Sequence, residues 1–371
     1  MIFYVGLMLF IILFWFLLIG FPTRQRIKLY CFGVCTVLFS LMAFKGPNIG
    51  NDTPVYIALY NQLLNTVNLL DNPTRYELGY VIFSKITSWV FQDYQYLFVL
   101  VAIIVIVSIK NLVLKNSSII WMSFYLLISL RLYYFFLSGL RQTIAVAIVC
   151  ISYQYIKEQK PIKFSLVVLL ATTFHYTAII FLIAYPISRL KFNRKGAFIV
   201  LLATILTYFL FNPVISLVFR IMPSYYSHYQ DATYFAENNL ANYINALVIL
   251  VFFLLGIIYR NSRQSISSFE KPDLIIDRGM YSEKDTLSYF MLVAFAIALI
   301  AVKASILDRV YMYFWIFGIV YIPNVLSKIR NKKEAVLIQY FIIVLTCAYN
   351  LIILYYRPNW NNIVPYTFFW Q

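Results

Sequence analysis

Charged residues are scarce in this chain. Only 12% of its 371 residues are Asp, Glu, Lys or Arg, whereas 62% are hydrophobic and the mean hydropathy is +0.78. A soluble domain needs far more polar surface, so this composition excludes the soluble class. Short apolar runs alternate with polar loops, which predicts an all-α polytopic integral membrane protein. We expect residues 1–371 to form a single integral membrane domain.

Histidine and cysteine are also rare, with two and four copies. All four cysteines (Cys31, Cys35, Cys150 and Cys347) fall inside apolar runs, and their spacing fits no zinc or disulfide framework. Glycine-rich phosphate loops, HExxH and GxSxG are absent. We therefore expect no metal site and no cofactor, and any chemistry must come from scattered ionisable side chains.

Acidic residues are outnumbered, since 14 Asp and Glu stand against 30 Lys and Arg, for a net charge of +16. The basic residues cluster in short loops between apolar runs, such as "PTRQRIK", "KEQKPIK", "RLKFNRK" and "SKIRNKK". The positive-inside rule explains such clusters as cytoplasmic loops. We therefore expect a membrane lipid environment and no nucleic-acid partner.

These loops predict about ten to twelve crossings with both termini outside. The first run, Ile2–Phe21, lacks the basic start and the cleavage site of a signal peptide and is expected to be the first crossing. External loops are predicted at about 45–77 and 220–242, and the main cytoplasmic loop at about 260–286. The first external loop should hold a short amphipathic helix at Val55–Leu64, and Val81–Phe91 is short enough to be half-inserted or re-entrant.

Two basic cytoplasmic loops, residues 157–163 and 189–195, are separated by roughly 25 residues. The segment between them must form either two thin spans or a re-entrant hairpin. In both cases His175 lies near the apex of the excursion, close to the outer face.

A set of ionisable residues remains at the predicted outer face once the cytoplasmic loops are removed. Such groups are costly in or beside membrane helices, so each is a candidate for function. The set contains Asp52, Asp71, Arg75, Glu77, Arg131, Arg141, His175, Asp231, Glu237, Lys303, Asp308, Arg309 and Arg357. Their convergence from distant parts of the chain on one face is the main physical signal in the sequence.

Arg141 begins an apolar helix, where its charge opposes the helix dipole, so an anion held there would gain from the guanidinium and from free N–H groups. Phosphate binding is the preferred role. Arg309 is either half of an interfacial ion pair with Asp308 or a second phosphate clamp. Arg131 either snorkels to lipid headgroups or joins the phosphate site. His175 is a packing residue, a proton-transfer group or a phosphate contact.

Asp52 precedes Thr53-Pro54 and reads as a helix N-cap, and Glu77 reads as a cap or as a partner of Arg75. Either carboxylate is alternatively a general base that activates an acceptor hydroxyl. Trp360 and the outer tyrosines suit either the membrane interface or stacking on sugar rings.

The ordered segments "GNDTPVYIALY", "RYELGYVIFSKI", "SGLRQTIAVAIVCISYQYI", "FSLVVLLATTFHYTAIIFL" and "IVPYTFFW" resemble the EpsG family of Wzy-type bacterial polysaccharide polymerases. The resemblance runs from about Asn48 to Tyr366. One departure is the start of the first motif, where family members often show Gly-Asp-Tyr and this chain has Asn51-Asp52-Thr53-Pro54.

The resemblance implies a GT-C-like helical bundle in the bacterial inner membrane, active at its periplasmic or outer face. Its substrate would be an oligosaccharide repeat unit on undecaprenyl diphosphate, and a chain-length regulator would be a partner. The implied site residues are Asp52, Glu77, Arg141, His175 and Arg309. Together with the chemistry above, we expect Asp52, Glu77 and His175 to be catalytic and Arg141, Arg309, Arg131 and His175 to bind the diphosphate without a metal. The alternative function is a flippase or transporter of the lipid-linked oligosaccharide.

Overall fold

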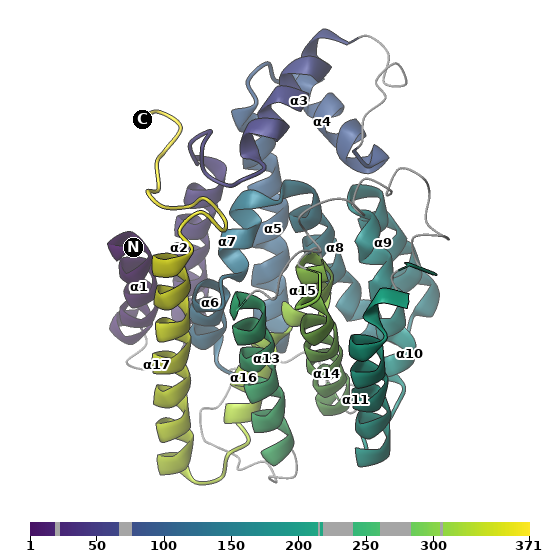
Figure 1. Ribbon diagram of the computed structural model, residues 1–371. Helices are drawn as coiled ribbons and strands as arrows, with labels where there is room; N and C mark the ends of the chain where they lie inside the picture. Colours follow the sequence, from purple (N-terminus) through teal and green to yellow (C-terminus); the bar gives the residue numbers. More distant parts are fainter. Residues whose placement is uncertain (19–22, 67–75, 214–215, 218–239, 260–282, 305–306) are drawn as a thin grey trace.

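The structure is a computed structural model of the chain that describes residues 1–18, 23–66, 76–213, 216–217, 240–259, 283–304 and 307–371 (Figure 1). These residues are largely helical, and their only β-type pairing is an isolated bridge between Lys45 and Phe368. The predicted all-α fold class is confirmed. Of the predicted loops, most of 220–242 and 260–286 lie outside the described residues, as do Asp71, Arg75, Asp231 and Glu237.

The helices of the first half begin with two long segments and end at a short 3-10 helix, η2. In order they are α1 (Ile2–Leu18), α2 (Arg24–Ala43), α3 (Thr53–Asn65), α4 (Leu78–Val90), α5 (Gln95–Asn116), α6 (Ile120–Ser129), α7 (Leu132–Ser138), α8 (Leu140–Lys157), α9 (Pro161–Phe174) and η2 (Tyr176–Ile183). The second half contains α10 (Ala184–Ser188), α11 (Arg194–Phe209), α13 (Leu240–Ile258), α14 (Glu283–Ala301), α15 (Asp308–Trp315), α16 (Gly318–Leu326) and α17 (Lys332–Tyr356).

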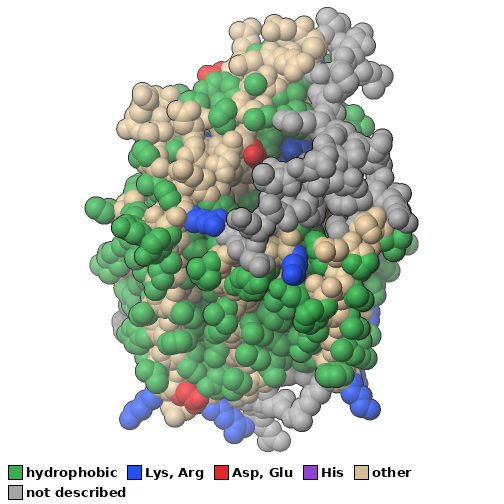
Figure 2. All heavy atoms as spheres, in the orientation of Figure 1, with side chains coloured by type: hydrophobic (Ala, Val, Ile, Leu, Met, Phe, Trp, Pro, Cys, Tyr) green, Lys and Arg blue, Asp and Glu red, His purple; other side chains and the backbone are tan. Residues whose placement is uncertain are grey.

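The long helices run side by side in one bundle, and both chain termini lie at the same end (Figure 1). Large apolar side chains also point outward, for example Phe16 on α1 and Leu337 and Phe341 on α17. Figure 2 shows apolar side chains over the middle of this face and Lys and Arg at its lower rim. An apolar exterior of this kind suits lipid, and the basic rim lies opposite the end that carries both termini.

By length and apolar composition, four described helices are able to cross a membrane: α2, α5, α13 and α17. Two bent pairs raise the number to six if each is one span: α6 with α7, bent by 57°, and α15 with α16, bent by 43°. Further apolar helices are shorter, at 10–17 residues, including α1, α9 and α11. The chain is thus a polytopic membrane protein, and the number of ten to twelve crossings stays a prediction.

The bend between α6 and α7 lies at Leu130 and Arg131. Arg131 adopts a left-handed backbone with φ +64°, which bends the chain, and the apolar run after it continues as α7. The bend places the end of α7 beside the loop that precedes α3, because a Cβ on Gly50 (φ +94°) would lie 2.3 Å from the Leu137 carbonyl oxygen.

Helices α3 and α4 pack on each other and lie as a cap beyond the end of the bundle that carries both termini (Figure 1). The predicted short helix at Val55–Leu64 is confirmed by α3. The segment expected to be half-inserted or re-entrant forms α4, whose contacts are with α3, α9 and α5. Its polar residues Ser84 and Lys85 are buried while Ile86 and Trp89 are exposed, so its insertion in the membrane stays a prediction.

Candidate active site

The candidate residues lie at helix ends that meet beneath the α3–α4 cap. Asp52 directly precedes α3, Glu77 directly precedes α4, and Arg141 and Arg309 are each the second residue of α8 and of α15. His175 is the turning point between α9 and η2, as predicted for the apex of that excursion. Figure 2 shows a hollow below the cap, with acidic and basic side chains at its edge.

Glu77 is the centre of the arrangement. One carboxylate oxygen, Oε2, accepts a hydrogen bond from Arg141 Nη1. The other, Oε1, lies 2.9 Å from His175 Nδ1 and 3.4 Å from the Tyr176 backbone N–H, which donates to it. The side chains of Glu77, His175 and Arg141 are only 4%, 12% and 18% exposed, so these pairs are shielded from solvent. We call these three residues the buried trio.

The close approach of α4 to α9 depends on a glycine. A Cβ on Gly79 would lie 2.3 Å from Thr173 Oγ1 and 2.7 Å from the Thr173 carbonyl oxygen. Only a residue without a side chain fits between these backbones. Gly79 follows Glu77 by two residues, and Thr173 precedes His175 by two, so this contact brings the carboxylate to the imidazole.

Neither carboxylate acts as the N-cap that its position suggests. Asp52 and Glu77 stand at the N-cap positions of α3 and α4, and Pro54 lies in the first turn of α3, as expected. However, neither side chain makes a capping hydrogen bond. Both carboxylates are therefore directed to charged partners from other segments.

The pKa of Glu77 reflects two opposing effects. Burial alone would raise it, but the hydrogen bond with His175 and the positive charge of Arg141 outweigh burial and lower the pKa from 4.5 to about 2. The carboxylate is therefore ionised at neutral pH and only accepts hydrogen bonds. It follows that His175 donates through Nδ1–H.

His175 is held in its neutral form. Burial lowers its pKa below 6.5, the Glu77 carboxylate raises it, and the charges of Arg141 and Arg309 lower it. With Nδ1 carrying the proton, Nε2 has a free lone pair. Nε2 is buried and has no hydrogen-bond partner among the described residues. A carboxylate that orients an imidazole in this way prepares the opposite nitrogen to accept a proton.

Arg141 was expected to bind an anion at the start of its helix. The structure supplies an anion from the protein itself, the Glu77 carboxylate. The guanidinium also lies over the Tyr76 ring, 5.0 Å from its centroid, and its charge counteracts the burial that raises the pKa of the Tyr56 hydroxyl. A positive charge at the start of a helix opposes the helix dipole, and the Glu77 carboxylate and the Tyr76 ring offset this cost for Arg141.

Asp52 and Arg309 form a second, looser pair. Arg309 Nη2 lies 4.0 Å from Asp52 Oδ2, and the two side chains are 44% and 35% exposed. Gln142, next to Arg141, donates from Nε2 to the Arg309 carbonyl oxygen and so joins α15 to α8. Arg309 was expected to pair with Asp308 or to bind phosphate, and its ion pair in the structure is instead with Asp52, from the other half of the chain. We call Asp52 and Arg309 the exposed pair.

Arg131 is not part of either group. It is 7% exposed, donates from Nη2 to Asn361 Oδ1 at 3.1 Å, and lies over the rings of Tyr134 and Trp360. Arg131 lies at the bend before α7, where its φ is +64°, and Arg141 lies at the start of α8. The two arginines are only ten residues apart in the sequence, but because of the bend they have different neighbours. A buried guanidinium of this kind does not snorkel to lipid headgroups.

Two buried tyrosines join the site without having been singled out from the sequence. Tyr56 on α3 is buried, which raises the pKa of its hydroxyl, and the charges of Arg141 and Arg309 lower that pKa while the charge of Asp52 raises it. Tyr313 on α15 lies with its hydroxyl 3.1 Å from Thr177 Oγ1, two residues after His175. Each tyrosine follows a predicted site residue by four positions, Asp52 and Arg309, which is one helical turn. This spacing of four residues is the signal in the sequence that could have identified both tyrosines as site residues.

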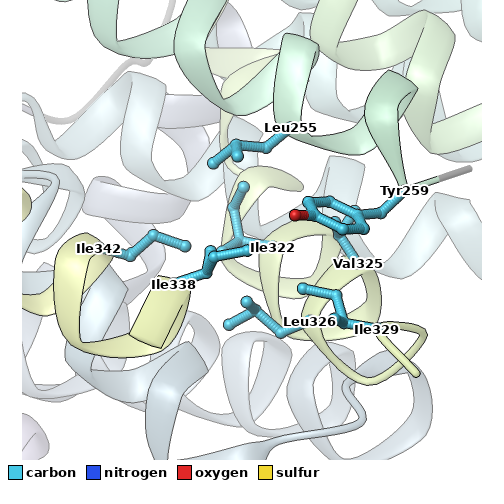
Figure 3. A pocket seen from close by; sticks show the side chains of 8 residues that line it. All are labelled: Leu255, Tyr259, Ile322, Val325, Leu326, Ile329, Ile338 and Ile342. Atoms are coloured by element: carbon cyan, nitrogen blue, oxygen red, sulfur yellow. The ribbon is translucent and has the colours of Figure 1, made fainter. Parts of the chain in front are cut away.

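An apolar pocket lies away from these charges, between α13, α16 and α17 (Figure 3). It is lined by Leu255, Tyr259, Ile322, Val325, Leu326, Ile329, Ile338 and Ile342. The Tyr259 hydroxyl donates to Glu334 Oε1, so this pocket offers no free proton-transfer group to a substrate. Within the described ranges, no three His, Cys, Asp or Glu side chains gather as metal ligands.

Comparison with known proteins gives one family. The model of the EpsG family matches residues 27–368, which is nearly the whole chain. No curated protein and no solved structure gives a match. The matched range contains every residue of the buried trio and of the exposed pair.

Proposed function

We propose a function from the premise that this chain belongs to the EpsG family, a family of Wzy-like polysaccharide polymerases. The chain is a glycosyltransferase that moves a growing glycan from undecaprenyl diphosphate onto the next lipid-linked oligosaccharide repeat unit. It acts at the outer face of the bacterial inner membrane. Family membership, the apolar bundle and the gathering of ionisable residues at the end opposite the basic rim support this proposal.

The pairing of Glu77 with His175 carries the proposal. In the transfer, a hydroxyl oxygen of the acceptor sugar bonds to the anomeric carbon of the donor, and the bond from that carbon to the diphosphate oxygen breaks. The hydroxyl proton goes to His175 Nε2, and the electron pair of the broken bond leaves with the diphosphate. Glu77 holds the imidazole in the required tautomer and stabilises the imidazolium that forms. Either carboxylate was a candidate for the base, and this geometry favours His175 supported by Glu77.

Arginine supplies the charge that the leaving diphosphate needs. Arg309 is 44% exposed and only loosely paired, so its guanidinium is able to exchange Asp52 for two phosphate oxygens. Arg141 lies deeper and is bound to Glu77. It contributes its positive charge and its Nε–H, which has no hydrogen-bond partner among the described residues. Fixed guanidinium groups in a site of low dielectric stabilise developing negative charge, so the step needs no metal. We do not assign Arg131 to the diphosphate.

The test is a glycan gel from a deletion strain, with the lipid-linked intermediates extracted alongside. The proposal predicts single repeat units at the cell surface and no ladder of longer chains, because export proceeds while polymerisation fails. A flippase would instead leave undecaprenyl-linked units on the cytoplasmic side. Complementation with the wild-type chain should restore the ladder, and complementation with His175→Ala should not.

A further inference from the structure

The segment after α17 returns across the loop that carries Asp52. The Trp360 carbonyl oxygen accepts from Asn51 Nδ2 at 2.6 Å, and the Asn362 carbonyl oxygen accepts from the Gly50 backbone N–H at 2.9 Å. Asn362 Nδ2 donates back to the Asn48 carbonyl oxygen at 2.9 Å. This segment therefore fixes the 48–52 loop. The residue that Trp360 contacts, Asn51, directly precedes Asp52, the partner of Arg309.

The Trp360 ring is held from one side and half-buried. The Arg131 guanidinium carbon lies 5.3 Å from its centroid, and Arg131 is anchored in turn by Asn361 Oδ1 at 3.1 Å and by the Tyr134 ring at 5.6 Å. A cation over an aromatic face fixes the orientation of the ring. Arg131 is buried, and its partners Asn361, Tyr134 and Trp360 are uncharged, so holding Trp360 and Asn361 is the role its contacts indicate.

Trp360 carries an oriented aromatic ring on a segment that is hydrogen-bonded to Asn51, the residue before the part-exposed Asp52 carboxylate. An aromatic ring and a carboxylate together match the chemistry of a pyranose. The apolar face of a sugar ring stacks on an aromatic face, while its hydroxyl groups donate to carboxylate oxygens. Asp52 is 35% exposed and lies 4.0 Å from Arg309, so it has free lone pairs for such hydroxyl groups. We propose that Trp360 and Asp52 form a saccharide subsite for a sugar of the repeat unit, and that Arg131 is a positioning residue for it.

This proposal rests on the proposed function and adds where the sugar binds. It also separates two tryptophans of the same segment. Trp370 is 61% exposed and stacks on Phe368, with centroids 4.5 Å apart, as an interfacial residue does. Trp360 is bound through its backbone and its ring to residues next to the site. Trp370 is therefore the matched control.

The experiment measures binding of the repeat-unit oligosaccharide, released from its lipid by mild acid, to the purified full-length protein by calorimetry. Trp360→Leu should weaken binding about tenfold, and Trp360→Phe should recover part of the loss. Trp370→Leu should bind as the wild type does. An unchanged Kd in a folded Trp360→Leu protein would overturn the proposal and leave Trp360 as an interface anchor. If Trp360→Leu does not fold, Asp52→Asn provides the test, with weaker binding expected and unchanged binding contrary to it.

The positioning role of Arg131 has a separate readout. Arg131→Lys keeps the charge but loses the planar contact, so it should weaken oligosaccharide binding in the wild-type background and have no further effect in Trp360→Leu. Equal effects in both backgrounds would contradict positioning through Trp360. His175→Ala should bind the oligosaccharide normally while forming polymer far more slowly, so a failure of the subsite and a failure of the proposed chemistry give different results.

Discussion

The buried trio and the exposed pair use the same kinds of side chain at the same end of the molecule, but they are built differently. In the trio, Glu77 lies 2.9 Å from His175, is bonded to Arg141, and is only 4% exposed. In the pair, Asp52 and Arg309 are 4.0 Å apart and more than one-third exposed. From this difference we infer two roles: the trio holds the base in one geometry, and the pair opens to bind a ligand.

Physical magnitudes support this division. A buried charge left without its partner costs about 3–5 kcal/mol, so the trio keeps one geometry. An exposed ion pair contributes about 0–1 kcal/mol, so Arg309 loses little by leaving Asp52 for a phosphate. We expect removal of a charge from the trio to affect stability as well as chemistry. Substitutions in the pair should leave stability nearly unchanged while they affect substrate binding and, through Arg309, the charge around His175.

Arg141→Ala should have the largest effect on stability, about 3–5 kcal/mol, because it leaves the ionised Glu77 buried with only His175 beside it. Thermal unfolding of the purified protein in micelles measures this loss. Adding Glu77→Gln should recover a large part of it, since the unpaired charge is then removed. A loss below about 1 kcal/mol would place Arg141 in the class of exposed pairs and break the comparison.

Gly79→Ala should disturb the trio from outside. Its Cβ would meet Thr173 at 2.3 Å and push α4 away from α9, which separates Glu77 from His175. We expect a cost of about 1–3 kcal/mol and a loss of polymer length on a glycan gel. Gly6→Ala is the matched control, because nothing lies within 4 Å of the added Cβ. Normal polymer in Gly79→Ala would show that the α4–α9 contact does not set the chemistry.

The pH dependence of polymerisation should follow His175. Burial lowers its pKa below 6.5, so the base is free at neutral pH, and the rate should fall only as the pH drops below that lowered value. Arg309→Gln removes a charge that lowers the pKa, so the acidic limb should move to higher pH. Arg309→Lys keeps the charge and should leave the limb in place. If the acidic limb moves equally in both variants, the charge of Arg309 does not set the pKa of His175, which would contradict this prediction.

Asp52→Asn should have the smallest effect on stability, below about 1 kcal/mol, since the pair it breaks is exposed and loose. Unfolding temperatures of Asp52→Asn and the wild type should agree closely, while oligosaccharide binding differs. A large loss of stability would mean that Asp52 belongs with the buried trio.

The membrane class, the α3 helix and the turn at His175 were predictable because each depends on a local pattern. Composition fixes the class, a run of apolar residues after Asp52-Thr53-Pro54 fixes α3, and two basic loops enclose His175. The predicted outer-face set contains Glu77, Arg141 and His175, which the structure brings together.

The pairings themselves were not predictable. Glu77 lies 64 and 98 residues from its two partners, and only tertiary packing around Gly79 decides which charges it meets. The sequence suggested Arg75 as the partner of Glu77 and Asp308 as that of Arg309, because nearby residues are the ones a local pattern can join. Arg131 was grouped with Arg141 for the same reason, and one left-handed residue separates their surroundings.

The most direct test of the buried trio as the chemical centre is the rate of polymer formation by His175→Ala, reconstituted in lipid with the lipid-linked repeat unit. Our account predicts a folded protein that binds the released oligosaccharide and forms polymer about 10²–10⁴-fold more slowly than the wild type, the usual contribution of a positioned base. A wild-type rate in that variant would contradict the account.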